Sequence, residues 1–159
     1  MLGTERGSRS RLGELAGVHP ALDAQLAELT TEVASKLVET FGVGADTAGA
    51  LLVAAGDNPE RLRSEAAFAM LCGASPVEAS SGKTVRHRLN RGGDRQANAA
   101  LYRIVIVRMR YHAPTRAYVE RRTAQGLSKA EIIRCLKRYV AREVYGILHD
   151  TVASAAVAA

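Results

Sequence analysis

The segment of residues 79–95 contains the side chains best suited to chemistry. It reads Ala-Ser-Ser-Gly-Lys-Thr-Val-Arg-His-Arg-Leu-Asn-Arg-Gly-Gly-Asp-Arg, so two adjacent hydroxyls, Ser80 and Ser81, stand among basic residues and glycines. Guanidinium groups match phosphate oxygens with two parallel hydrogen bonds, and glycine backbone allows a ligand to approach closely. The segment therefore predicts contact with phosphate groups. The candidate phosphate-binding residues are Lys83, Arg86, Arg88, Arg91 and Arg95.

Two interpretations of this basic segment follow from spacing alone. It is either a basic patch that faces nucleic acid or solvent, or a site in which a serine hydroxyl attacks a phosphate. A serine hydroxyl is a weak nucleophile at neutral pH and needs activation, and cationic donors stabilise the charge that develops in the transition state. A nucleotide-binding P-loop is excluded, because no glycine stands five residues before Gly82, where position 77 is Val.

Positive charge is concentrated around this segment. Residues 60–142 contain 18 Lys and Arg against 6 Asp and Glu, whereas the remainder contains 4 against 10. The resulting net charge of +12 in residues 60–142 indicates a polyanionic partner. The five tyrosines stand at helical spacing, which favours packing of their rings between helices over stacking of the rings on nucleic-acid bases. They are Tyr102, Tyr111, Tyr118, Tyr139 and Tyr145.

Length and composition limit the fold that positions these residues. The chain has 159 residues, of which 47% are hydrophobic and only 4% aromatic. This length fits one domain, and a core of Ala, Leu and Val favours a mainly α fold. No apolar run approaches the roughly 18–20 residues of a membrane span, and the N-terminus lacks the apolar stretch of a signal peptide. We therefore expect a cytoplasmic protein with no membrane partner.

The two cysteines, Cys72 and Cys135, each lie in a helical apolar pattern. A zinc site requires closely spaced Cys and His ligands, such as a CxxC motif. Neither a CxxC motif nor a His/Cys cluster accompanies these two cysteines. The sequence therefore predicts two reduced core thiols and no metal site.

The first forty residues predict a helical arm. Residues 1–19 contain four glycines without a sustained period, so we expect an irregular segment, and Pro20 is expected to open a helix. In residues 20–40 the apolar residues share one helical stripe, which is Leu22, Leu26, Leu29, Val33 and Leu37. This stripe either packs on the chain's own domain or forms a short coiled-coil arm that contacts a second protomer.

A tight turn is expected after this arm, at Phe41-Gly42-Val43-Gly44, and Asp46 is expected to cap the following helix. The turn, with an Ala four residues on, resembles a helix-hairpin-helix motif, in which glycines bring backbone N–H groups close to a phosphate. Gly42 and Gly44 are therefore candidate nucleic-acid-binding residues. A plain corner between two helices is the alternative.

Capping residues predict three further helix starts. Ser64 and Asp94 precede helical patterns, and Ser128 with Glu131 forms a capping box. Between the first two, residues 73–93 form the longest non-helical stretch, in which alternating apolar and basic residues predict a basic loop or a short strand. The expected organisation is an irregular segment at 1–19, an arm at 20–40, a compact helical domain at 41–150 and a frayed tail at 151–159.

Five stretches resemble a known family: Leu71-Cys72-Gly73-Ala74-Ser75-Pro76, Ala79-Ser80-Ser81-Gly82-Lys83, Arg88-Leu89-Asn90-Arg91-Gly92-Gly93-Asp94-Arg95, Gly42-Val43-Gly44 with Ala48, and Glu131-Ile132-Ile133-Arg134-Cys135-Leu136-Lys137-Arg138-Tyr139. Together they resemble the C-terminal domain of the IS-one-ten family of bacterial insertion-sequence transposases, which is related to the Piv/MooV DNA invertases. The likeness covers roughly residues 20–148.

The resemblance implies a site-specific DNA recombinase whose C-terminal domain supplies a serine nucleophile. In the family this serine attacks a DNA phosphodiester and holds the strand as a phosphoserine. The serine before the glycine is Ser81 here, and the adjacent Ser80 stays the alternative. Lys83, Arg86 and Arg88 are near enough in sequence to stabilise the developing charge.

The resemblance also implies a metal and partners. Full-length members have an N-terminal RuvC-like domain whose acidic residues bind divalent metal, so Mg²⁺ is expected there and no cofactor is expected on this chain. The expected partners are DNA and a guide RNA encoded by the element. The expected location of the protein is the bacterial cytoplasm, in association with the nucleoid. The hypothesis is a truncated transposase that binds nucleic acid and is inactive alone.

Two other classes of function stay open. The first is a non-enzymatic helix-hairpin-helix module that binds DNA or RNA. The second is an oligomerisation piece that associates through residues 20–40 and modulates an intact transposase.

Overall fold

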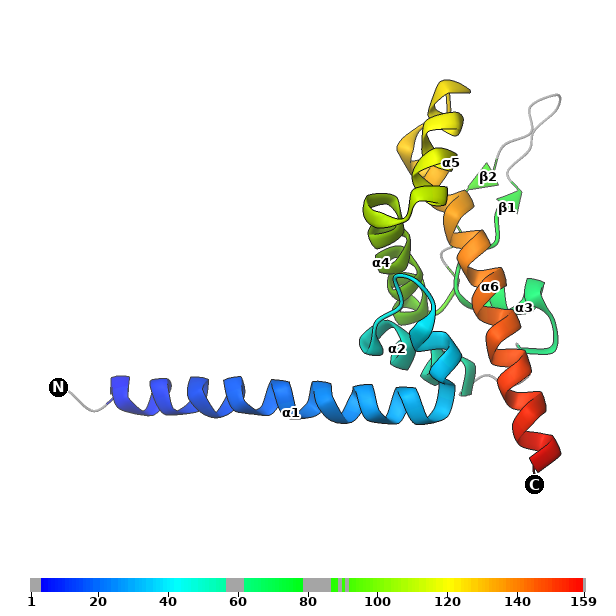
Figure 1. The fold of residues 1–159 in the computed structure, drawn as a ribbon. Helices are drawn as coiled ribbons and strands as arrows, with labels where there is room; N and C mark the ends of the chain where they lie inside the picture. The colour runs from blue at the N-terminus through cyan, green and yellow to red at the C-terminus, as the bar shows by residue number, and fades with distance from the viewer. Residues whose placement is uncertain (1–3, 57–61, 79–86, 89, 91, 159) are drawn as a thin grey trace.

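The computed structural model describes residues 4–56, 62–78, 87–88, 90 and 92–158. Its elements are α1 (Thr4–Glu39), α2 (Ala45–Gly56), α3 (Glu65–Leu71), β1 (Val77–Glu78), β2 (His87–Arg88), α4 (Arg95–Tyr111), α5 (Ala113–Ala124) and α6 (Lys129–Ala158). Within these ranges the chain forms six helices and one two-stranded sheet (Figure 1). The prediction of a mainly α fold is confirmed.

The core lies where α4 packs against α2 and α6 (Figure 1). The apolar residues of α4 recur at helical spacing, so Leu101, Ile104 and Val105 face inward and are fully buried. Leu51 of α2 and Val144 of α6 are also fully buried. Each such side chain stabilises the fold by about 1.5–3 kcal/mol through its removal from water. These three helices therefore form the rigid frame that positions the segments at its edge.

Three helices start at the predicted capping residues. The side chain of Ser64 accepts a hydrogen bond from a first-turn N–H of α3, and Asp94 Oδ1 accepts one in α4. At α6 the Ser128 N–H donates to Glu131 Oε2 over 2.8 Å, and the Glu131 N–H donates back to Ser128 Oγ over 3.4 Å. These contacts satisfy N–H groups that the first turn leaves without a helical partner. The three capping predictions are confirmed.

The prediction that Asp46 caps α2 is wrong. The Gly44 N–H donates to Thr47 Oγ1, and the Thr47 hydroxyl donates to the Gly44 carbonyl, each over 2.9 Å. Asp46 lies in the first turn, where the positive end of the helix dipole stabilises its negative charge. Its carboxylate also forms an ion pair with Arg103 of α4. Because α2 begins at Ala45, Asp46 lies inside the helix and not at the capping position.

Both ends of the chain are more helical than predicted. α1 begins at Thr4, so the irregular segment at 1–19 is wrong, and Pro20 lies inside the helix rather than at its start. A proline removes one backbone hydrogen bond, but Ala, Leu and Glu dominate the flanking residues and favour helix on both sides. The separate tail at 151–159 is also wrong, because alanine-rich sequence continues α6 to Ala158.

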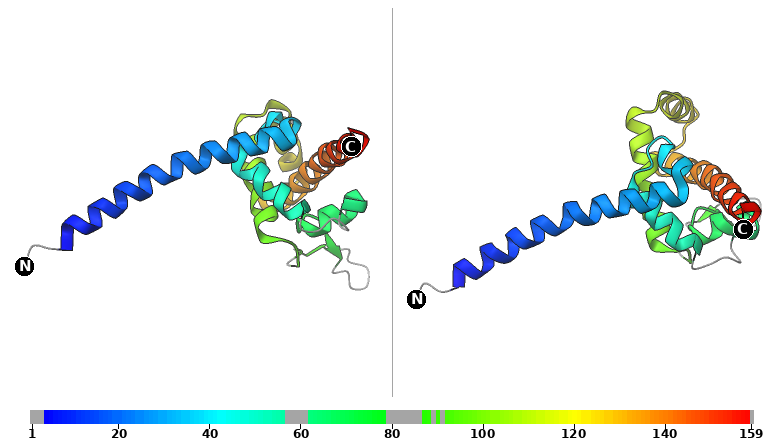
Figure 2. Two further views of the ribbon diagram at one scale, coloured as in Figure 1. Left: turned by 90° about the horizontal axis from the view of Figure 1, so that it is seen from below. Right: turned by 60° about the horizontal axis from the view of Figure 1, so that its bottom comes forward.

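α1 projects as a long arm from the rest of the molecule (Figures 1 and 2). Ala34 and Leu37 are buried near its end, and the backbone of Ala34 is non-helical (φ −150°, ψ 62°), which marks a kink. Leu29 and Val33 of the predicted stripe remain 58% and 56% exposed. Leu26 is partly buried and lies against Gly49 of α2, so the stripe packs on the chain's own domain at Leu26 and Leu37 but not at Leu29 and Val33.

The two strands form a short antiparallel pair in which Val77 lies opposite Arg88 and Glu78 lies opposite His87. The prediction of a short strand within residues 73–93 is confirmed at β2. Because a two-stranded sheet is marginally stable by itself, contacts at its base must position it.

Candidate nucleic-acid interface

The structure describes part of the predicted phosphate-binding segment. Lying outside the described residues are Ser80, Ser81, Lys83, Arg86 and Arg91. Arg88 belongs to β2, of which only the backbone is described, and Arg95 is the exposed first residue of α4. The described residues on either side nevertheless define the base from which this segment leaves the helical body.

Close backbone contacts join the two sides of this base. The Asp94 N–H donates to the Leu71 carbonyl over 2.6 Å. A Cβ built on Gly93 would lie 2.4 Å from the Gly73 nitrogen, closer than any side chain permits. Gly73 has φ +62°, a left-handed conformation that glycine adopts without strain. These glycines are therefore required by the crossing of two backbone segments.

A chain of polar contacts lies beneath this base. Asn98 Nδ2 of α4 donates to the Cys72 carbonyl over 2.8 Å, and Lys137 Nζ of α6 donates to Asn98 Oδ1 over 2.7 Å. Lys137 is only 6% exposed, and this burial lowers its pKa. Burial and then the Asp94 carboxylate raise the pKa of the Cys72 thiol to about 12, which leaves it protonated and unreactive.

Sequence reasoning missed Asn98 and Lys137. Lysine is ordinarily solvent-exposed, so the residue type by itself indicates no buried role for Lys137. The available signal was its spacing, because Lys137 stands four residues before Ala141, which is fully buried on the inner face of α6.

The predicted turn before α2 is as tight as expected. Gly42 has φ +83°, and a Cβ built there would lie 3.3 Å from Arg108 Cγ, so the turn packs closely on α4. The Val43 N–H donates to the Thr40 carbonyl over 3.0 Å, and the Gly44 N–H is engaged by Thr47. Two N–H groups of the turn are thus used internally, and phosphate binding at Gly42 and Gly44 stays a prediction.

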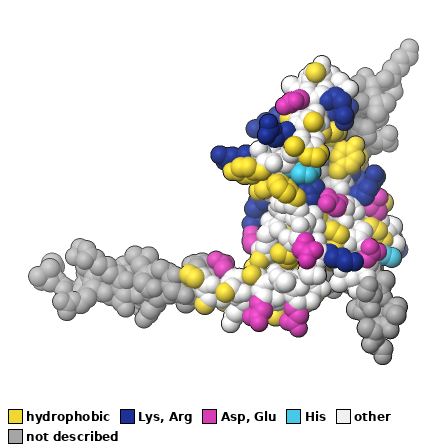
Figure 3. Space-filling model, in the orientation of Figure 1, with side chains coloured by type: hydrophobic (Ala, Val, Ile, Leu, Met, Phe, Trp, Pro, Cys, Tyr) yellow, Lys and Arg dark blue, Asp and Glu magenta, His cyan; other side chains and the backbone are white. Residues whose placement is uncertain are grey.

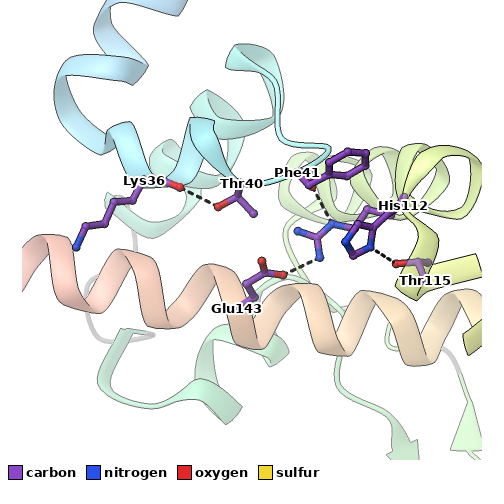
Figure 4. Close-up of polar contacts among 7 residues, drawn as sticks. Lys36, Thr40, Phe41, His112, Thr115 and Glu143 are labelled. Atoms are coloured by element: carbon purple, nitrogen blue, oxygen red, sulfur yellow. Dashed lines mark hydrogen bonds and ion pairs between the residues drawn. The ribbon is translucent and has the colours of Figure 1, made fainter.

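Arg108 of α4 fixes this turn to α4 and α6. Figure 4 shows its two partners, Phe41 and Glu143. Its Nε donates to the Phe41 carbonyl over 2.8 Å, and its Nη1 forms an ion pair with Glu143 Oε2 of α6 over 2.7 Å. The His112 ring packs on Phe41 with a centroid distance of 5.0 Å, and His112 Nδ1 lies 2.8 Å from Thr115 Oγ1. Because the side chain of Arg108 is only 10% exposed, this residue positions the turn and does not offer its charge to a ligand.

Basic side chains gather over α4 and α5, whereas acidic ones lie mostly toward α1 and α2 (Figure 3). Exposed basic residues of α4, α5 and the start of α6 are Arg95, Arg103, Arg110, Arg116, Arg121, Lys129 and Arg134. The sequence of α4 contains no acidic residue at all. The concentration of charge predicted for residues 60–142 therefore has a surface counterpart in these helices.

The same surface exposes aromatic side chains. Tyr111 is 62% exposed with the Arg110 guanidinium over its ring at 5.3 Å, and Tyr102 is 47% exposed. The expectation that tyrosines pack between helices is wrong for these two. Aromatic rings among arginines are the side chains on which bases stack, so the α4 surface is a second candidate contact for nucleic acid.

Two features are absent from the residues that the structure describes. Among these residues, no group of three or more His, Cys, Asp or Glu side chains lies close enough together to hold a metal ion. Likewise, none of the helices within them combines the length and apolar character needed to cross a bilayer.

Comparison with known proteins identifies the family. A model described as Transposase IS116/IS110/IS902 family matches residues 34–120, more than half of the chain. This chain belongs to that transposase family. The match begins near the end of α1, includes the turn at Gly42, the basic segment and α4, and ends within α5. The family resemblance stated from the sequence is thereby confirmed.

One curated relative of this transposase chain comes from Streptomyces coelicolor and is described as "Insertion element IS110 uncharacterized 43.6 kDa protein". The two are 29% identical over 147 residues. The aligned region covers 89% of this chain and 36% of the relative, so the chain spans about a third of that protein's length.

Proposed function

We propose that this transposase chain binds DNA and supplies the serine nucleophile that cleaves and transfers a DNA strand. The observation that supports the proposal best is the extent of the family match. Residues 34–120 include the segment with Ser80 and Ser81, its base at Gly73 and Gly93, and the basic surface of α4.

The proposed reaction is a phosphoryl transfer to serine. The Ser81 hydroxyl gives up its proton as its Oγ forms a bond to phosphorus, the bond from phosphorus to one deoxyribose oxygen breaks, and that oxygen takes up a proton. The strand is then held as a phosphoserine until a second deoxyribose hydroxyl displaces the serine. Lys83, Arg86 and Arg88 are proposed to stabilise the transition-state charge, and Ser80 is the alternative nucleophile.

Mg²⁺ is not assigned to the described residues of this chain. They provide no group of His, Cys, Asp and Glu side chains that fits the ion. In a full-length transposase its proposed place is the RuvC-like domain, and the step above is written with residues of this chain only.

Serine substitutions in a full-length family transposase that contains this chain test the proposal. S81A is expected to abolish the covalent protein–DNA adduct and strand cleavage, with DNA affinity within about twofold of the unchanged protein, because the basic surface stays intact. S80A is the matched control and should retain cleavage. Cleavage by S81A but not by S80A would move the nucleophile to Ser80, and cleavage by both variants would refute a serine mechanism at this segment.

DNA binding through the surface of α4 and α5 makes a separate prediction. Each phosphate contact releases counterions, so with about six contacts the affinity should fall about 1,000-fold between 50 and 200 mM salt. Fluorescence anisotropy with labelled duplex DNA measures this dependence, and competition with the element's RNA tests the proposed guide RNA as a second partner. An affinity that does not change with salt would contradict binding by this surface.

The alternative, a non-enzymatic helix-hairpin-helix module, is tested at Gly44. A Cβ built on Gly44 meets no atom within 4 Å, so G44A should fold normally. If the turn approaches a phosphate closely, G44A weakens DNA binding about tenfold or more. An unchanged affinity would leave the turn as a structural corner.

Association through α1 is a second candidate function, favoured by its exposed apolar stripe. Leu22, Leu29 and Val33 are each more than half exposed, and the spacing of the stripe is that of a coiled-coil seam. A dimer through this arm should be lost in L29K and kept in E32K, which changes a residue off the stripe. Light scattering coupled to gel filtration measures the mass, and a monomer at all concentrations would refute the association.

A further inference from the structure

Lys137 is a buried cation with a neutral partner. Its side chain lies inside the body with Asn98 Oδ1 as its hydrogen-bond acceptor at 2.7 Å. None of the ion pairs found among the described residues includes Lys137. A single neutral hydrogen bond compensates poorly for the removal of an ammonium group from water.

This lysine therefore contributes little to stability compared with an apolar side chain of the same length. Leu136 and Ala141 are buried beside it on the same helix, and a methionine at position 137 would continue that apolar face. The presence of a lysine at this position is explained by the side chain that its ammonium group holds.

That group is the side chain of Asn98, which reaches from α4 to the turn after α3. Asn98 Nδ2 donates to the Cys72 carbonyl, and it also lies 2.7 Å from the position that a Cβ on Gly73 would occupy. Lys137 fixes the orientation of the amide, because its ammonium accepts no hydrogen bond and can face only the carbonyl oxygen of Asn98. The amide nitrogen is thereby directed at Cys72.

The turn that receives this contact is the base of the β1–β2 hairpin. On its other side, Asn90 Nδ2 donates to the Met70 carbonyl over 3.4 Å, and the Asp94 N–H donates to the Leu71 carbonyl. Three successive carbonyls, those of residues 70, 71 and 72, are thus each contacted by a donor from the chain that follows β2. The position of the hairpin relative to α4 and α6 depends on this row of contacts.

We propose that Lys137 is a positioning residue that, through Asn98 and the Cys72 carbonyl, sets the placement of the β1–β2 hairpin for strand cleavage. The proposal rests on the proposed serine chemistry, because β1 and β2 flank the segment that contains Ser80 and Ser81. Lys137 touches neither DNA nor the reacting atoms. Its loss loosens the turn at Cys72 from which the chain continues into β1, while the basic surface of α4 and α5 stays intact.

The first test measures the contact itself in this chain, without any activity. K137M should raise amide hydrogen exchange at Ala74 and Asp94 at least tenfold, because both N–H groups belong to the turn, and leave exchange at Leu101 in the core unchanged. K129M, which removes an exposed lysine from the start of the same helix, is the matched control and should change none of them. Unchanged exchange in K137M overturns the proposal.

The second test measures cleavage in a full-length family transposase that contains this chain. At saturating DNA, K137M should cleave about 100-fold more slowly, the loss that a displacement of about 1 Å produces, with DNA affinity within twofold. K137R restores the cation and its donors and should regain at least tenfold. A merely structural lysine would lower melting temperature, affinity and cleavage together, and that result overturns the proposal.

N98D keeps the experiment decisive if K137M fails to fold. The new carboxylate can pair with Lys137, which preserves the folded body, but it has no N–H to donate to the Cys72 carbonyl. N98D should therefore fold and cleave slowly, and rapid cleavage by N98D overturns the proposal. S81A and S80A separate the two proposals: if both variants cleave normally, the serine mechanism fails, whereas the exchange measurements still decide the role of Lys137.

Discussion

Substitution of Arg108 offers a direct test of how the turn before α2 is held against the helical body. R108M removes the guanidinium group but keeps an apolar side chain of similar length, so the packing of its stem on Gly42 is retained. Two contacts are lost, namely the hydrogen bond to the Phe41 carbonyl and the ion pair with Glu143. The expected effect is a destabilised fold.

The magnitude follows from the environment of each contact. A hydrogen bond from a charged donor contributes about 1.5–3 kcal/mol, which applies to the Phe41 carbonyl. The Glu143 side chain is 44% exposed, so water can replace its partner and the ion pair adds only about 0.5 kcal/mol. Arg108 Nη2 is buried without a partner among the described residues, and its removal returns about 1 kcal/mol. The net expected loss is about 2 kcal/mol.

Urea unfolding followed by far-ultraviolet circular dichroism measures this loss. For a chain of 159 residues it corresponds to a decrease in melting temperature of about 4–8 °C. R103M is the matched control: Arg103 also reaches from α4 to the same region, but its pair with Asp46 is 48% and 69% exposed. R103M should therefore change stability by less than about 0.5 kcal/mol. Equal losses in R108M and R103M would refute the argument that burial decides the difference.

Three further predictions concern other contacts. Hydrogen bonds from the Ser128 hydroxyl and backbone lower the pKa of Glu131, so this carboxylate stabilises α6 above the ordinary glutamate pKa and ceases to do so as pH falls through the lowered value. The difference in melting temperature between the unchanged chain and S128A should accordingly shrink as the pH is lowered, and a growing difference would contradict it. Iodoacetamide should label partly exposed Cys135 well before Cys72, whose thiol is buried with a pKa of about 12, as peptide mass spectrometry can show; equal rates would contradict the assigned burial. L101A, which leaves a cavity in the centre of the core, should lower the free energy of unfolding by about 3 kcal/mol in urea, and a loss below 1 kcal/mol would place Leu101 outside the core.

Features that depend on a few neighbouring residues were predictable from the sequence. Ser64, Asp94 and Ser128 all cap helices as expected, because an N-cap needs only a side-chain oxygen within three residues of the free N–H groups. The inner faces of α4 and α6 were equally predictable from helical periodicity, as the burial of Ile104 and Val144 confirms.

Features that depend on distant parts of the chain were not predictable in this way. Asp46 was a reasonable cap by residue type, but α2 begins at Ala45, so Asp46 lies inside the first turn, where it pairs with Arg103 of a distant helix. Tyr111 stands at helical spacing, but its ring remains 62% exposed in the packed molecule. Lys137 became buried because Asn98, on another helix, supplies an acceptor that the spacing of α6 does not reveal.

For the candidate site, the sequence by itself determined the chemistry: the hydroxyls of Ser80 and Ser81, the basic residues beside them and the family to which they belong. These are properties of residue types and of their short spacing along the chain, and both can be read directly from the sequence. Only the tertiary structure decided the support beneath them, where α3, α4 and α6 bring Cys72, Asn98 and Lys137 into one chain of contacts. The physical reason is that burial and hydrogen-bond partners arise when distant segments pack, and no local pattern encodes which donor meets which acceptor.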